Sequence, residues 1–258
     1  RRQRQMCIRD RIYRYWLPRL LPGVDAVITD SRASKADIAR FLKVPPARIR
    51  VVHLGVSDAY QPGSPGKVEE VRSRYELPNR YLLYLGSTRK HKNLGGLLAA
   101  YDRLHWMGPA PSLVVAGVTA KECRSFLVKV PGVSALEGSI VCLDYVAEAD
   151  LPALYSGALL LVRPGLYEGF GLPPLEAMAC GTPVVCSNVA SLPEVVGDAA
   201  ITVDPYDVEA LAEAMHQVLS DRDLRHDLRC RGLERAAAFT WERTARQTVA
   251  VYREVLNS

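Results

Sequence analysis

Short apolar runs alternate with segments of helical periodicity along most of the chain, and this alternation limits the fold more than any other feature of the sequence. We expect strands at residues 81–85, 112–116, 140–143, 158–162, 183–186 and 200–203. Helices are expected between and after them at residues 94–104, 120–129, 149–155, 173–180, 208–219, 221–238 and 241–256. Strands that alternate with helices form parallel sheets covered on both faces, so the predicted fold class is α/β with a doubly wound parallel sheet.

Turn-forming residues gather at Gln61–Gly66, which is therefore the predicted domain boundary. Before it, residues 23–31 fit a strand that ends at a helix cap, and residues 49–54 fit the next strand. Ser34 and Asp37 fit a capping box for the helix between these strands. The predicted division is residues 1–62, residues 67–239 and a terminal helical segment at residues 240–258.

The stretch Pro164–Gly181 carries the strongest functional signal, with one carboxylate at Glu168 and a second eight positions later at Glu176. It follows an expected strand, and its prolines and final glycine bound a short helix. In an open parallel sheet, the loop between such a strand and helix lies at the edge where ligands bind. Gly169 and Gly171 let backbone N–H groups approach an anion, which the helix N-terminus attracts. The stretch therefore predicts binding of phosphate and sugar.

A second loop at the end of an expected strand is rich in positive charge. Residues 86–93 contain Arg89, Lys90 and Lys92, and Asn93 can cap the helix that follows. Basic residues on loops are often only solvated. The position at the carboxyl end of a strand favours a contact with the phosphates of a nucleotide.

The stretch from Pro164 to Gly181 resembles the E-x7-E signature of retaining GT-B glycosyltransferases of the large group-one family. The similarity continues through residues 181–186 and 191–197 and covers roughly residues 12–256. It implies that residues 67–239 form the Rossmann-like domain that binds the nucleotide-sugar donor. Residues 1–62 would be the C-terminal remnant of the N-terminal acceptor domain, and residues 240–258 a helix that crosses back to that domain.

The resemblance also assigns roles to individual residues. Glu168 would meet the hydroxyls of the donor sugar, and Glu176 the ribose diol, since a carboxylate accepts from two neighbouring hydroxyls. Lys92 is the first choice for the pyrophosphate and Arg89 the second, while the segment with Tyr145 faces the nucleotide base. The implied catalytic residues are Glu168, Arg89 and Lys92. The implied donor-binding residues are Gly86, Arg89, Lys92, Tyr145, Val146, Glu168, Gly169, Phe170, Gly171, Leu172 and Glu176.

The activity that the resemblance implies is transfer of a hexose, such as mannose, from a nucleotide sugar to a glycan or lipid-linked acceptor with retention of anomeric configuration. The donor would be a GDP- or UDP-sugar, bound as a substrate, with no other cofactor and no metal. The biological setting implied is cell-surface polysaccharide or lipopolysaccharide biosynthesis. Because only one strand–helix–strand unit precedes Gly66, we expect the chain by itself to bind donor without efficient transfer.

Other functions remain open from the residues alone. Glycosidases also use two carboxylates as their catalytic groups, although hydrolysis does not require a glycine loop between them. The same residues would serve a non-catalytic nucleotide-sugar binding module, a phosphorylase or a sugar-nucleotide epimerase. Two glutamates that merely flank a solvated turn are the simplest alternative. No G-x-x-x-x-G-K-[ST] sequence occurs, and Pro174 replaces the third glycine of a dinucleotide fingerprint.

The net charge of +5 is concentrated at the start of the chain, where six of the first fourteen residues are arginines. Such a run is usually solvated, and attraction to an anionic membrane surface is the functional alternative. No apolar run approaches the roughly 18 residues that a membrane-spanning helix needs. The expectation is a cytoplasmic protein with peripheral membrane association at the inner face of the membrane, and no nucleic-acid partner.

The six cysteines show no C-x-x-C pair, so we expect free, mostly buried thiols. Neither they nor the five histidines have the spacing of a metal site. His53 and His91 are expected to be structural.

Overall fold

The computed structural model describes residues 16–130, 136 and 138–257. The chain divides into two compact units, which are described separately. The larger unit is Val56–Thr240, and the smaller combines Arg1–Gly55 with Trp241–Ser258.

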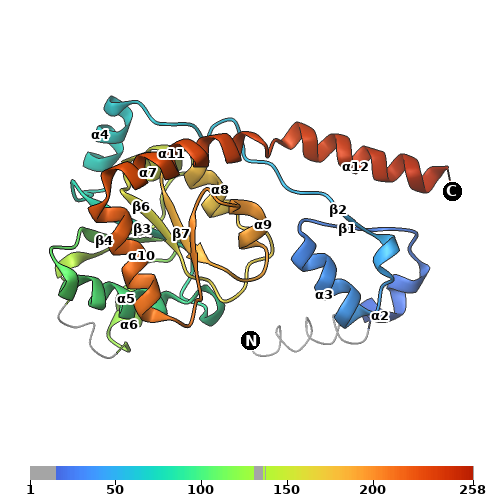
Figure 1. The fold of residues 1–258 in the computed structure, drawn as a ribbon, viewed down its shortest axis with the longest axis horizontal. Helices are drawn as coiled ribbons and strands as arrows, with labels where there is room; N and C mark the ends of the chain where they lie inside the picture. The colour runs from blue at the N-terminus through green and yellow to red at the C-terminus, as the bar shows by residue number, and fades with distance from the viewer. Residues whose placement is uncertain (1–15, 131–135, 137, 258) are drawn as a thin grey trace. The chain divides into compact units, whose positions relative to one another are not determined.

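The larger unit is built on a six-stranded sheet whose neighbouring strands are all parallel (Figure 1). Its strands are β3 (Tyr81–Leu85), β4 (Ser112–Ala116), β5 (Ile140–Cys142), β6 (Leu160–Arg163), β7 (Val184–Ser187) and β8 (Ile201–Val203). The spatial order is β5-β4-β3-β6-β7-β8. The chain thus winds outward from β3 in one direction, returns to β6 beside it, and winds outward in the other. β3 and β6 flank the switch point, where open α/β sheets bind ligands.

Helices cover both faces of this sheet, which confirms the predicted doubly wound α/β fold. On one face α10 packs against α5, and on the other α8 packs against α7 and α11. The helices are α4 (Pro65–Arg74), α5 (Leu94–Met107), α6 (Ala120–Leu127), α7 (Leu151–Gly157), α8 (Leu172–Ala179), α9 (Leu192–Val196), α10 (Val208–Ser220) and α11 (Arg222–Ala237). Two 3-10 turns, η4 (Lys90–Lys92) and η6 (Glu148–Asp150), lie in the loops.

The core is apolar on both sides of the central strands, as buried parallel strands require. Leu82 and Leu83 point to opposite faces of β3, and both are fully buried. The helix α5 contributes Leu94, Leu97, Leu98, Tyr101 and Leu104 to the core, which is the predicted helical stripe. This packing fixes the ends of β3 and β6, from which the candidate site extends.

The smaller unit contains the parallel strands β1 (Val27–Thr29) and β2 (Ile49–Val51) with the helix α3 (Arg32–Leu42) between them. Short turns α2 (Leu17–Leu20), η2 (Leu21–Gly23) and η3 (Pro46–Arg48) and the terminal helix α12 (Trp241–Leu256) complete it. Within this unit Arg50 pairs with Glu254, and the Thr244 hydroxyl donates to the His53 carbonyl over 2.7 Å. The capping box predicted at Ser34 is wrong, because α3 begins at Arg32 and the Ser31 hydroxyl accepts from the Ser34 N–H.

A disulfide joins Cys123 of α6 to Cys142 of β5, with 6.0 Å between their Cα atoms. The prediction of free thiols is therefore wrong for these two residues. Their 19-residue separation gave no pairing signal, because the contact depends on how α6 folds back beside β5. Cys180 and Cys186 are free and buried, as predicted, whereas Cys230 is free but exposed. Cys7 lies outside the described residues.

Among the helices of the described residues, none combines the length and the apolar character needed to cross a bilayer.

Candidate functional site

Two loops meet at the carboxyl ends of β3 and β6, where the strand order reverses. The Leu166 N–H donates to the His91 carbonyl over 2.8 Å, which joins the loop after β6 to the loop after β3. The Asn93 amide donates to the carbonyls of Pro164 and Pro205 over 3.0 and 2.8 Å. Asn93 occupies the N-cap of α5 as predicted, but its side chain holds these loops together instead of capping the helix.

Glu168 lies at the centre of this junction, and its carboxylate is paired with two cations. Lys92 Nζ lies 2.8 Å from Glu168 Oε2, and Arg163 Nε and Nη2 lie 2.8 and 2.6 Å from Glu168 Oε1. Glu168 is only 7% exposed and Arg163 only 3%. A buried carboxylate needs such compensation, because desolvation without a partner costs several kcal/mol. The structure thus brings together Glu168 and Lys92, which the sequence placed 76 positions apart.

Arg163 is a site residue that the sequence reasoning missed. It ends β6, its Nη1 also donates to the Leu85 carbonyl at the end of β3, and its guanidinium lies 6.0 Å from the centre of the Tyr84 ring. Gly86 is required beside it, because a Cβ at that position would overlap the guanidinium. The available signal was a charged residue at the end of an apolar strand, where an unpaired charge would be costly.

Buried serine hydroxyls hold the backbone of the loop that carries Glu168. The Ser191 hydroxyl lies 2.9 Å from the Glu168 carbonyl and 2.7 Å from the Phe170 carbonyl, and the Ser187 hydroxyl donates to the Gly165 carbonyl over 2.5 Å. These contacts fix the backbone before α8. Gly171 then turns the chain into the helix with a φ of +113°, a conformation that favours glycine.

Glu176 lies on α8 and is paired with a tyrosine. The Tyr155 hydroxyl donates to Glu176 Oε2 over 2.7 Å, and Tyr60 lies next to this pair. Burial raises the pKa of Glu176 above its ordinary value, and hydrogen bonds from Tyr155 and Tyr60 only partly oppose this effect. Burial, with the nearby Glu176 charge, also raises the pKa of Tyr60 to about 12. The tyrosines therefore remain hydroxyl donors to the carboxylate.

A cavity of about 440 Å³ opens at the carboxyl ends of β3, β4 and β5. Tyr145 and Val146 line it, and Tyr145 is 85% exposed whereas Val146 is buried. Asp144, another lining residue, accepts from the Ala120 N–H over 2.8 Å and so supports the start of α6. The other lining residues are Leu85, Gly117, Val118, Thr119, Glu122 and Leu151.

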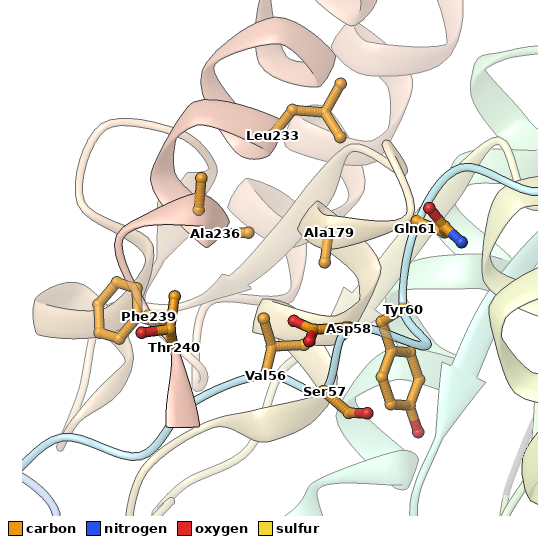
Figure 2. A pocket seen from close by; sticks show the side chains of 11 residues that line it. Val56, Ser57, Asp58, Tyr60, Gln61, Ala179, Leu233, Ala236, Phe239 and Thr240 are labelled. Carbon is orange, nitrogen blue, oxygen red and sulfur yellow. The ribbon is translucent and has the colours of Figure 1, made fainter. Parts of the chain in front are cut away.

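A second cavity, of about 350 Å³, lies where the chain enters and leaves the larger unit (Figure 2). Figure 2 shows Leu233 and Ala236 of α11 on one side and Asp58 and Tyr60 of the entering segment on the other. The Val56 N–H donates to the Phe239 carbonyl over 3.0 Å, which joins the segment that enters the larger unit to the segment that leaves it. Tyr60 belongs to the wall of this cavity and also lies beside Glu176.

The other predicted site residues lie outside the ion pairs and hydrogen bonds of Glu168 and Glu176. Arg89 is exposed just before η4, and no partner for its side chain is found within the described residues. Partial burial and the adjacent Lys92 lower the pKa of His91. Gly169, Phe170 and Leu172 lie on the turn into α8, with Phe170 buried. In the described part of the chain, no cluster of three or more histidine, cysteine or acidic side chains could hold a metal ion.

The strand order defines a doubly wound protein, and the paired carboxylate at the switch point marks a candidate ligand site at the carboxyl edge of its sheet. Sequence comparison gives the family. The sequence model of glycosyl transferases group 1 matches residues 68–235, and that of glycosyltransferase family 4 matches residues 3–60. The chain belongs to the group 1 glycosyltransferases and has their GT-B type of fold.

Two relatives illustrate the similarity in sequence. The chain is 41% identical to the O-antigen chain mannosyltransferase B of Escherichia coli over 90% of its own length and 61% of the relative. It is 34% identical to the MMP alpha-(1->4)-mannosyltransferase of Mycolicibacterium hassiacum over 92% of its length and 56% of the relative. The chain thus spans about three fifths of these relatives.

Solved structures share the fold. Sucrose-phosphate synthase from Thermosynechococcus elongatus matches with a TM-score of 0.78 and 28% identity over 93% of this chain and 60% of that protein. Anabaena HepE in complex with UDP and glucose matches with a TM-score of 0.83 and 18% identity over 94% of this chain and 66% of that protein.

Proposed function

We propose that this chain binds a nucleotide-sugar donor at the switch point and belongs to an enzyme that transfers the sugar, a mannosyl group, with retention of configuration. The observation that carries this proposal is the buried Glu168 held between Lys92 and Arg163 at the meeting of the loops after β3 and β6. Two relatives that are mannosyltransferases by name support the choice of sugar. A GDP- or UDP-sugar is the proposed donor, with no further cofactor.

The donor would extend along the carboxyl edge of the sheet. The cavity beside Tyr145 and Val146 offers space for the base, and Glu176 would accept from the ribose diol with its second oxygen. Lys92 supplies positive charge for the diphosphate, and N–H groups of Gly169–Leu172 supply hydrogen bonds to the phosphates and sugar. Arg89, whose side chain is exposed, supplies further charge.

The proposed chemistry is substitution on one face of the sugar. The acceptor hydroxyl oxygen bonds to the anomeric carbon on the face from which the diphosphate leaves. The bond from that carbon to the diphosphate oxygen breaks, its electrons go to the diphosphate, and the hydroxyl proton passes to a diphosphate oxygen. Lys92 and Arg89 stabilise the negative charge that develops on the leaving group.

Glu168 is proposed to hold the sugar hydroxyls and not to attack the sugar. Its carboxylate is already paired with Lys92 and Arg163, which leaves it less available to form a covalent bond with the sugar. An ionised carboxylate only accepts hydrogen bonds, and this property suits it to position hydroxyl groups.

The acceptor is proposed to be a glycan or a lipid-linked saccharide in cell-surface polysaccharide biosynthesis, with peripheral contact of the protein with the membrane. The name of the Escherichia coli relative, an O-antigen chain mannosyltransferase, supports this class of acceptor. The arginine-rich start of the chain supports the membrane contact.

A transfer assay tests the proposal. The chain is incubated with GDP-mannose or UDP-glucose and with mannose-containing oligosaccharides, and the anomeric configuration of the product is read by NMR. Because we expect this chain by itself to transfer inefficiently, the incubation is long, and the small amount of product from an α-linked donor should be α-linked and lost on Glu168→Gln. Release of free sugar without an acceptor would indicate a hydrolase, conversion of the donor alone an epimerase, and binding without any reaction a donor-binding module.

A further inference from the structure

A basic pocket of about 260 Å³ lies at the edge of the sheet opposite to the donor site. Ala158 and Leu159 come directly before β6, and Pro183 comes directly before β7, so these lining residues mark the amino ends of the two strands. The donor-site loops follow the carboxyl ends of β3 and β6 instead. The two sites are therefore separated by the length of the strands.

The charge of this basic pocket comes from one face of α11. Arg222, Arg225, His226 and Arg229 all line the pocket. At about 100° of rotation per residue, these four positions fall within an arc of about 100° on the helix surface. The acidic residues Asp223 and Asp227 fall outside that arc, so the positive charges are not interleaved with negative ones.

Two of the arginines are fixed by backbone carbonyls. Arg225 Nη1 donates to the carbonyls of Val218 and Leu219 at the end of α10 over 2.8 and 3.0 Å. Arg229 Nη1 donates to the Gly181 carbonyl over 3.0 Å. Each guanidinium has five N–H donors, so each keeps others for a ligand. Their geometry is thus set before any ligand arrives.

None of the three arginines has a carboxylate partner within the described residues. Asp227 pairs with Arg231, and Asp221 accepts from the Leu224 N–H over 2.9 Å as the cap of α11. Asp223 is exposed outside the arc. Arg222 also lies in the first turn of α11, where the helix dipole disfavours positive charge. An anion in the pocket would relieve both the mutual repulsion and this unfavourable placement.

We propose that this basic pocket binds a phosphate group. Planar guanidinium groups match the paired oxygens of a phosphate, and three of them converge on one cavity. The volume lies below the roughly 300–1,000 Å³ typical of sites for whole small molecules, which suits a single phosphate better than a nucleotide. The Ser156 hydroxyl adds no charge and already donates to the Pro152 carbonyl over 2.8 Å, so recognition rests on the arginines. The phosphate is either free or part of a lipid headgroup.

The test uses Arg222→Gln, because Arg222 is exposed and has no partner among the described residues, so its loss leaves the fold intact. Arg124→Gln on α6 is the matched control, since it removes the same charge from an exposed position elsewhere in the larger unit. Thermal unfolding is followed while inorganic phosphate is titrated, with sodium chloride at equal ionic strength as the reference. Lys92→Ala is measured in parallel to identify phosphate bound at the donor site.

We expect phosphate to raise the melting temperature of the wild type more than chloride does. The apparent Kd for phosphate should rise about tenfold in Arg222→Gln, in line with the loss of a charge-assisted hydrogen bond, and stay unchanged in Arg124→Gln. Phosphate should still raise the melting temperature of Lys92→Ala by the amount that is attributed to Arg222. Equal phosphate responses in wild type and Arg222→Gln, or an equal effect of chloride, would overturn the proposal.

Vesicle sedimentation then separates the two sources of phosphate. Phosphatidylcholine vesicles with and without phosphatidylglycerol are mixed with the wild type and with Arg222→Gln. If the ligand is a lipid headgroup, more wild type than variant should sediment with the vesicles that contain phosphatidylglycerol. Free phosphate should then reduce the amount of wild type that sediments. Binding of free phosphate with no difference between the proteins on vesicles assigns the site to a soluble phosphate.

Discussion

Glu168 shows how a single residue can be placed by its neighbours before any ligand binds. Arg163 reaches it from the end of β6 and Lys92 from the turn after β3, so each cation comes from a different strand of the switch point. Arg163 is buried whereas Lys92 is partly exposed. Arg163 therefore holds Glu168 in place, and in our proposal Lys92 is the cation that exchanges its partner for a phosphate.

Lys92→Ala should weaken binding of a nucleoside diphosphate more than that of the corresponding monophosphate, because the lysine faces the distal phosphate in our proposal. The difference should shrink at high salt, since a partly exposed charge is screened. Calorimetric titration with both nucleotides measures it. Lys90→Ala is the matched control, because Lys90 lies on the same turn and is exposed. Equal weakening of both nucleotides would place Lys92 outside the phosphate site.

Glu176→Gln should change the pH dependence of stability. Burial raises the folded-state pKa of Glu176 above its ordinary 4.5, so near that pH the folded protein keeps a proton that the unfolded chain releases. Wild-type stability therefore falls as the pH rises from about 4.5 through the folded-state pKa. The variant lacks this decline, so its stability relative to wild type should increase over that range.

Urea unfolding over a pH series measures this effect, with the exposed Glu213→Gln as control. Glu176→Gln should also lose donor affinity, on the order of 1–3 kcal/mol, if the ribose diol binds Glu176. A stability difference that does not change with pH would contradict the assignment of a buried, titrating Glu176.

At the scale of elements, the turn into α8 depends on Gly171. Gly171→Ala would force a Cβ to within 2.8 Å of Leu192 Cδ2 and place alanine at a φ of +113°. We expect a loss of about 1–3 kcal/mol in the free energy of unfolding and weaker nucleotide binding. Denaturant unfolding and titration check both. Gly66→Ala in α4 is the control, since a Cβ there meets open space, and it should be neutral or slightly stabilising. Similar effects of the two substitutions would contradict the role of Gly171.

The disulfide should stabilise the contact between α6 and β5. It closes a segment of 19 residues, for which the loss of chain entropy in the unfolded state corresponds to about 3 kcal/mol. Replacing both Cys123 and Cys142 by alanine should lower the free energy of unfolding by about that amount, and reduction of the wild type should have the same effect. Thiol labelling of the unfolded, unreduced chain should add two labels fewer than labelling after reduction. Equal labelling would show that the bridge is absent.

The elements themselves were largely readable from the sequence. The apolar runs at residues 81–85 and 112–116 coincide with β3 and β4, because buried strands need continuous apolar residues. The helix boundary at Ser34 was wrong, because a Ser-x-x-Asp pattern inside a helix is indistinguishable from one at its start. The disulfide was missed because it depends on tertiary contact alone.

At the scale of the whole molecule, the site could be predicted only in part. The sequence placed Lys92 and Glu168 each at the end of a strand, but the adjacency of β3 and β6 that brings them together depends on the strand order. Arg163, Ser187, Ser191 and the two tyrosines beside Glu176 were missed for the same reason. Their partners lie on other elements, and a local pattern marks only Arg163, as a charged residue at the end of an apolar strand.

The central claim is that the chain binds a nucleoside diphosphate sugar across the switch point. Isothermal titration calorimetry of the chain with GDP, UDP and ADP, followed by the corresponding sugars, tests it most directly. We expect one of these nucleoside diphosphates to bind with a stoichiometry near one, more weakly in Lys92→Ala and Glu176→Ala but equally well in Lys90→Ala. Absence of binding by all three nucleotides, or equal binding in both Lys92→Ala and Glu176→Ala, would contradict a donor site at the switch point.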